Sequence, residues 1–256
     1  MRAFSWFVFM LLILASVATA VPTRLAVHVI SKGGKFVGTS LGGALVTIRD
    51  ADTGELMARG VTAGSTGDTA KIMRDPRPHH APISTEGTAV FEATLDIDEP
   101  CRMEITAYGP LAQRQSANSA STTQWVVPGK HVTGGDGILL ELRGFVVDVL
   151  EPPTHVYLRG APQKVNIRAN VMMMCGCHIT PGGLWDADAL EMSVLLERDG
   201  KLIGTHPLQY ADMPSHFEAH ITADQPGAYQ ATVYVYNPAT GNTGVDHTTF
   251  VVTGSN

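Results

Sequence analysis

The sequence predicts an all-β protein built from two consecutive β-sandwich domains that follow a signal peptide. Three observations favour this fold class. Short runs rich in β-branched and aromatic residues alternate with Gly, Pro, Asn and Asp. Apolar and polar residues alternate with a period of two, and no long stretch has the 3.6-residue period of a helix. The 256 residues also suffice for two domains of roughly 100 residues each once the signal is removed.

The first 20 residues have the three parts of a secretory signal. Arg2 gives the positive start, residues 4–14 form an apolar core too short to span a bilayer, and Ala18-Thr19-Ala20 is a small-residue cleavage site. An uncleaved anchor is the alternative, but the cleavage site and the polar chain from Thr23 favour removal. No later stretch has the ~20 apolar residues of a membrane helix. We therefore expect a periplasmic or secreted protein with no membrane span in the mature chain.

Composition excludes several function classes. The net charge is −6 at pH 7 and the chain has no basic run, which makes it a poor nucleic-acid binder. Three cysteines are too few for a disulfide scaffold. Phosphate-loop and dinucleotide motifs are absent, and the acidic residues are spread singly. The sequence thus favours a non-enzymatic protein whose partner is another exported or envelope protein rather than a nucleic acid.

The first expected domain covers residues 21–150. Residues 44–60 have the pattern of a strand, an Asp-Thr-Gly turn and a second strand. Residues 85–91 then lead into a strictly alternating run, and the alternation resumes over residues 103–107. The apolar side of that run consists of Phe91, Ala93, Leu95 and Ile97.

This order of elements resembles the carboxypeptidase-regulatory-like, transthyretin-type β-sandwich family. In that family a V-x-I-x-D-x-x-T-G hairpin precedes a D/E-G-x-A-x-F strand, and here residues 46–54 and 86–91 match the two patterns. The chain departs from the family in a long insertion between them, Thr62 to Pro82. The resemblance implies a structural or binding module and no catalysis.

The expected boundary between the domains lies at Glu151-Pro152-Pro153. Two prolines remove backbone donors and stiffen the chain at that point. The apolar run before it, residues 145–150, is either the last strand of the first domain or a bridge into the second.

The second expected domain covers residues 151–256. Residues 165–174 and 190–197 read as strands, and Asp199-Gly200 forms a hairpin turn before another strand. A G-x-Y-x-x-x-V strand from Gly227, a G-N turn and a final strand over residues 248–252 resemble bacterial immunoglobulin-like domains. The shape also resembles cupredoxin-shaped modules of exported metal-handling proteins, although no metal motif of those families matches residue by residue.

The segment from Met172 to His178 is the densest cluster of soft, redox-active side chains in the chain. It holds two of the three cysteines and three of the ten methionines. The alternation places Met172 and Met174 on the exposed face of a strand that should end at Gly176. Cys175 and Cys177 are therefore expected at a sheet edge or loop mouth that solutes can reach.

Three hypotheses for this segment stay open. The first is a soft-metal site, with copper preferred because thiolate and thioether sulfur favour Cu(I). Its ligands would be Cys175, Cys177, His178, Met172 and Met174. The second is a thiol–disulfide redox pair. The third is plain packing in a structural or adhesion scaffold, with the pair and Met173 filling the core. Cys101 either pairs with one of these cysteines or is buried and unpaired.

Overall fold

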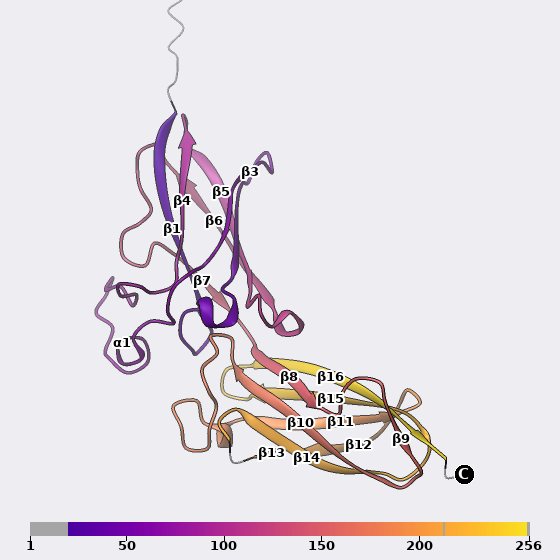
Figure 1. The fold of residues 1–256 in the computed structure, drawn as a ribbon. Coiled ribbons are helices and arrows are strands. Elements are labelled where there is room, and N and C mark those ends of the chain that lie inside the picture. Colours follow the sequence, from indigo (N-terminus) through magenta and orange to yellow (C-terminus); the bar gives the residue numbers. More distant parts are fainter. Residues whose placement is uncertain (1–19, 212, 255–256) are drawn as a thin grey trace, which may run out of the picture.

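The computed structural model describes residues 20–211 and 213–254, and nearly all of its regular structure is β-strand (Figure 1). The predicted all-β class is confirmed. The expected signal peptide lies outside the described residues, apart from Ala20. The strands form four sheets, and pairs of these sheets enclose two separate large apolar cores. We call the pair nearer the N-terminus the first sandwich and the other pair the second sandwich.

The first sandwich packs a three-stranded sheet, in the order β4-β1-β7, against a four-stranded sheet, in the order β3-β2-β5-β6. In β4 the alternating residues predicted to face the core are buried or half-buried. The strands are β1 (Val21–Ser31), β2 (Leu45–Asp50), β3 (Leu56–Val61), β4 (Phe91–Ile97), β5 (Cys101–Gly109), β6 (Asn118–Val126) and β7 (Ile138–Leu142). Most pairs are antiparallel, but β1 and β7 run parallel.

The turn between β2 and β3 is held by the side chain of Asp50. Its Oδ1 accepts hydrogen bonds from the backbone N–H groups of Asp52 at 2.9 Å and Thr53 at 2.7 Å. Such a local turn explains why the sequence motif places an aspartate at this point. The N–H groups of Thr53 and Asp52 also lower the pKa of Asp50 below its ordinary value, because they stabilise the charged form.

The insertion after β3 forms a small subcore against the first sandwich. It contains one short helix, α1 (Thr69–Met73), capped by the Asp68 carboxylate, which accepts from Lys71 N at 2.8 Å. Ile72 from the insertion and Ile83 just after it pack with Phe36. The family resemblance of this half to transthyretin-type domains stays an expectation.

The second sandwich packs a sheet with the order β8-β10-β14-β13 against a sheet with the order β12-β11-β15-β16-β9. Their bounds are β8 (Phe145–Glu151), β9 (Val156–Arg159), β10 (Gln163–Met173), β11 (Glu191–Arg198), β12 (Lys201–Pro207), β13 (Gln209–Tyr210), β14 (His216–Ala223), β15 (Gly227–Asn237) and β16 (Asn242–Thr253). The predicted turn at Asp199-Gly200 joins β11 to β12, and both residues have positive φ.

This strand order is that of an immunoglobulin domain. Lettered along the chain, one sheet reads A-B-E-D and the other C′-C-F-G, with β9 added in parallel to the last strand. At the start of β15 the buried Tyr229 donates its hydroxyl to the backbone oxygen of Gln225 at 2.6 Å, which is the tyrosine corner of such domains. Ala231 stands where antibody domains carry the second core cysteine. The predicted immunoglobulin-like β-sandwich is therefore confirmed.

Removing the hydroxyl of this corner should weaken the second sandwich. Tyr229→Phe keeps the stacked ring but leaves the Gln225 oxygen without its donor, so we expect the free energy of unfolding to fall by about 1 kcal/mol. Urea unfolding measures the change. Tyr157→Phe, at a residue that is 60% exposed, is the control and should change it by less than about 0.5 kcal/mol. Equal effects of the two variants would contradict the assignment.

Strand β8 belongs to the second group of sheets. It pairs antiparallel with β10, from Phe145 opposite Met173 to Glu151 opposite Arg168. The sequence allowed the apolar run at residues 145–150 to be either the last strand of the first domain or a bridge into the second. In the structure this run pairs with a strand of the second sandwich and with none of the first. The chain passes from β7 to β8 through residues 143–144 (Figure 1). The expected domain boundary at residue 151 stays a prediction.

Candidate functional site

The segment from Met172 to His178 forms a tight turn at the end of β10. The strand ends at Met173, three residues before the predicted end. Met173 N donates to Cys177 O at 3.1 Å, and Gly176 N donates to Met173 O at 2.8 Å. Gly176 has φ +80°, a left-handed conformation that favours glycine, and Cβ at this position would lie 3.2 Å from Leu41 Cγ. The predicted placement of the pair at a strand end is confirmed.

The two cysteines of this turn form a disulfide with each other. Cys175 and Cys177 are bonded across one residue, with their Cα atoms 5.5 Å apart. Their exposed fractions are only 1% and 8%, so the expectation that solutes reach both sulfurs was wrong. The reason is tertiary, because the first sandwich covers the turn. Its Lys35 N–H points at Cys175 Sγ at 3.4 Å, and Leu41 packs beside Gly176.

The methionines were also expected on an exposed face, and this was wrong. Met174 is fully buried and belongs to the core of the first sandwich, although the chain around it belongs to the second. Met172 is half-buried and packs against the same core. Met173 faces the core of the second sandwich. The alternation of the two faces along β10 is as predicted. At the end of the strand, however, the face that was expected to meet water contacts the first sandwich.

The proposed copper ligands do not converge on one point. The sulfurs are bonded to each other, and Met174 is committed to the core of the first sandwich. His178 is exposed, and its Nδ1 lies 3.4 Å from Ser215 Oγ. Among the described residues no group of three or more His, Cys, Asp or Glu side chains is arranged to hold a metal ion. Copper binding is not supported by this arrangement.

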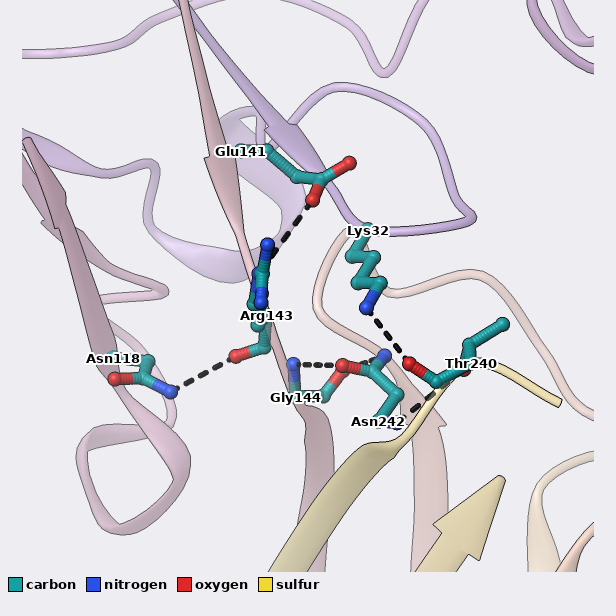
Figure 2. Close-up of polar contacts among 7 residues, drawn as sticks. All are labelled: Lys32, Asn118, Glu141, Arg143, Gly144, Thr240 and Asn242. Atoms are coloured by element: carbon teal, nitrogen blue, oxygen red, sulfur yellow. Dashed lines mark hydrogen bonds and ion pairs between the residues drawn. The ribbon is translucent and has the colours of Figure 1, made fainter. Parts of the chain in front are cut away.

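The turn lies in the middle of a junction between the two sandwiches. Trp185 packs on the second core and donates its indole Nε1–H to Gly33 O of the first sandwich at 2.8 Å. Lys32 Nζ donates to Thr240 O at 2.8 Å (Figure 2). A cavity of about 260 Å³ lies between these contacts, with Met173 and Trp185 in its wall.

Asn242 fixes the point where the chain crosses from one sandwich to the other. Its Oδ1 accepts from Gly144 N at 2.7 Å, and its Nδ2 donates to Gly144 O at 3.0 Å (Figure 2). Both residues are buried. The exposed Asn118 also donates to the backbone oxygen of Arg143 at 3.0 Å. These residues were not predictable from the sequence, because their partners lie up to about a hundred positions away and nothing local marks an asparagine as a bridge.

The third cysteine, Cys101, has no disulfide partner in the described part of the chain and is half-buried. Its thiol donates to Glu99 O at 3.2 Å. Burial raises the pKa of the thiol, and the nearby carboxylates of Asp50 and Glu99 raise it further. Of the two outcomes expected for Cys101, the structure shows the unpaired one.

The raised pKa makes Cys101 a slow nucleophile. Because only the thiolate reacts, iodoacetamide at pH 8 should alkylate Cys101 more slowly than a cysteine in a model peptide. Mass spectrometry of timed samples gives the rate. Glu99→Gln removes one of the charges and should raise that rate. A rate for the parent equal to the peptide rate would contradict the expectation.

No protein-family model matches the sequence, and no curated protein matches it. Solved structures with a similar arrangement include fibronectin(III)-like modules of CbhA from Clostridium thermocellum, with 13% identity, a TM-score of 0.31 and coverage of 91% of this chain and 95% of that one. A titin Ig tandem has 10% identity and a TM-score of 0.26, with coverage of 93% and 99%. An ICAM-5 ectodomain fragment has 14% identity and a TM-score of 0.25, with coverage of 91% and 50%.

These likenesses are too distant to carry an argument about function, so the assignment of the second sandwich rests on its own strand order and tyrosine corner. In the part of the chain that the structure describes, none of the helices has the length and apolar character needed to cross a membrane.

Proposed function

We propose that the protein is an exported, non-enzymatic scaffold that holds two β-sandwiches at a fixed angle and presents their outer faces to another exported or envelope protein. The observation that carries the proposal is the junction. It is made of buried side chains and of hydrogen bonds from side chains of one sandwich to the backbone of the other or of the crossover. A flexible tether would leave the chain between the sandwiches in contact with water.

Two features support a rigid junction. Met174 places a side chain from one sandwich inside the core of the other, so the sandwiches cannot separate without exposing an apolar group. The Asn242 amide satisfies both backbone groups of Gly144 at the crossover, so this residue has little freedom to act as a hinge. Interfaces with these properties suppress the domain motions that are otherwise expected in a two-domain chain.

Spin labels on the two sandwiches test the fixed angle. Thr123 and Thr222 are exposed strand residues of the first and second sandwich, and cysteines there can be labelled in a Cys101→Ser background without reductant. Double electron–electron resonance should give one narrow distance distribution. In the same labelled chain Asn242→Ala should broaden it. A broad distribution in the parent would show a flexible tether and end the proposal.

The partner is tested in the cells that export the protein. A photoreactive residue at position 123 or 222 should cross-link to one exported protein, and Asn242→Ala should reduce the yield although it lies inside the junction. An unchanged cross-linking yield in Asn242→Ala would mean that binding of the partner does not require a fixed angle between the sandwiches.

The copper hypothesis for Cys175 and Cys177 stays a prediction. It requires the disulfide to be reduced first. Mass spectrometry of the reduced protein with Cu(I), compared with the double serine variant, tests it.

A further inference from the structure

The sulfur of Cys175 has an unusual polar surrounding for a buried disulfide. Lys35 N–H donates to Cys175 Sγ at 3.4 Å. Ser31 Oγ is close by, because a Cβ placed on Gly34 would lie 3.0 Å from Ser31 Oγ and 3.2 Å from Cys175 Sγ. The hydroxyl and the sulfur are thus neighbours across the missing side chain of Gly34.

The Ser31 hydroxyl is an orphan. The residue is 1% exposed, and its Oγ has no hydrogen-bond partner among the described residues. Buried hydroxyls without a partner are rare, because each forfeits the hydrogen bonds that it made to water. Cys175 is a candidate acceptor beside it, because its disulfide sulfur is a poor acceptor but its thiolate would be a strong one.

The two cysteines differ in exposure. Cys177 is 8% exposed and is followed by the exposed His178, whereas Cys175 is 1% exposed and lies against the Ser31–Lys35 turn. An incoming nucleophile therefore meets Cys177 first, and the sulfur with the two available donors is the one that leaves.

We propose that the Cys175–Cys177 disulfide is a thiol–disulfide exchange site with a fixed polarity, attacked at Cys177 by a dithiol reductant and releasing Cys175 toward Lys35 N–H and the Ser31 hydroxyl. This goes beyond the scaffold function and does not depend on the partner of the scaffold.

The exchange proceeds in two balanced steps. One thiolate of the dithiol attacks Cys177 Sγ, a mixed disulfide forms, and the Cys175–Cys177 bond breaks with its electron pair on Cys175. The second thiolate of the reductant then attacks the reductant's first sulfur, which is bonded to Cys177 in the mixed disulfide, and Cys177 leaves as a thiolate. The dithiol is oxidised to a disulfide, the cysteine pair is reduced by two electrons, and two protons from the dithiol end on the two cysteines.

Substitution of Ser31 distinguishes a thiol–disulfide exchange site from a disulfide that only packs in the core. If the Ser31 hydroxyl bonds only to a reduced Cys175, Ser31→Ala removes a bond from the reduced form and removes an unpaired polar group from the oxidised form. Both effects favour the disulfide. If the hydroxyl has no part in exchange, the variant leaves the equilibrium unchanged.

The experiment uses the full chain with Cys101→Ser and dithiothreitol buffers of graded thiol-to-disulfide ratio, with maleimide trapping and mass spectrometry. We expect native reduction of the pair, and Ser31→Ala should lower the equilibrium constant for reduction roughly tenfold. Ser116→Ala is the matched control, because Ser116 also lies at the junction but bonds to Val147. It should change the constant by less than about twofold. Urea unfolding of the oxidised variants confirms that both fold.

A separate experiment determines which of the two cysteines is attacked. Brief exposure to glutathione, an acid quench and peptide mapping should place the adduct on Cys177. An adduct on Cys175, an unchanged constant in Ser31→Ala, or a pair that dithiothreitol reduces only in denaturant would each overturn the proposal. None of these outcomes bears on the spin-label distances of the oxidised scaffold.

Discussion

Replacing Met174 by alanine should lower the free energy of unfolding by about 2–5 kcal/mol. The side chain is fully buried in the core of the first sandwich. Its loss therefore removes apolar contacts and leaves a cavity between the two sandwiches, whose other contacts keep them from closing it. The expected loss is large because the site lies between two cores, and a rigid junction has little freedom to collapse around it. Urea unfolding followed by far-ultraviolet circular dichroism measures the effect.

Met172→Ala is the matched control for this variant. It removes the same side chain two positions earlier, from a half-buried site against the same core. Its cost should be less than half that of Met174→Ala, because part of the side chain already contacts water. If the two substitutions cost the same, Met174 does not join the two cores as described.

Asn242→Ala should cost about 2–4 kcal/mol. It breaks two hydrogen bonds to Gly144 and leaves a buried N–H and a buried C=O without partners at the crossover of the chain. We expect a lower midpoint in urea together with the broader spin-label distances described above. The two readouts belong together, because the same bonds hold the backbone in place and fix the angle.

Asn118→Ala is the control at the same junction. Asn118 is exposed and donates a single bond to Arg143 O, so water can replace the lost partner and the cost should stay below about 1 kcal/mol. A cost for Asn118→Ala that equals that of Asn242→Ala would mean that burial of the bridge contributes nothing.

Strands with a clear apolar face were predictable from the sequence. The predicted run at residues 91–97 has the bounds of β4, and the predicted hairpin at Asp199-Gly200 joins two strands of the second sandwich. Strand β6 is not predicted by any apolar alternation in the sequence. Its sequence consists mainly of Ser, Thr, Asn and Gln, and its neighbour β5 supplies the apolar face and the register. A polar strand carries no periodic signal of its own.

The candidate site shows where local pattern stops being informative. The Cys-Gly-Cys spacing indicated a bond or a ligand pair, and the strand-end position was correct. Burial was not, because it depends on Lys35 and Leu41, which lie far away in the chain and belong to the first sandwich. The orphan hydroxyl of Ser31 is equally invisible in sequence, since a serine at the end of a strand is ordinary.

The sequence by itself determined that this chain is an all-β protein and that it carries one cluster of soft side chains near the end of a strand. Both follow from alternation and turn residues, which act over only a few positions. Only the tertiary structure decided that this cluster is a covered turn between two sandwiches. Which face of a strand meets water, and which meets another domain, depends on residues more than a hundred positions apart, and no short-range pattern records that contact.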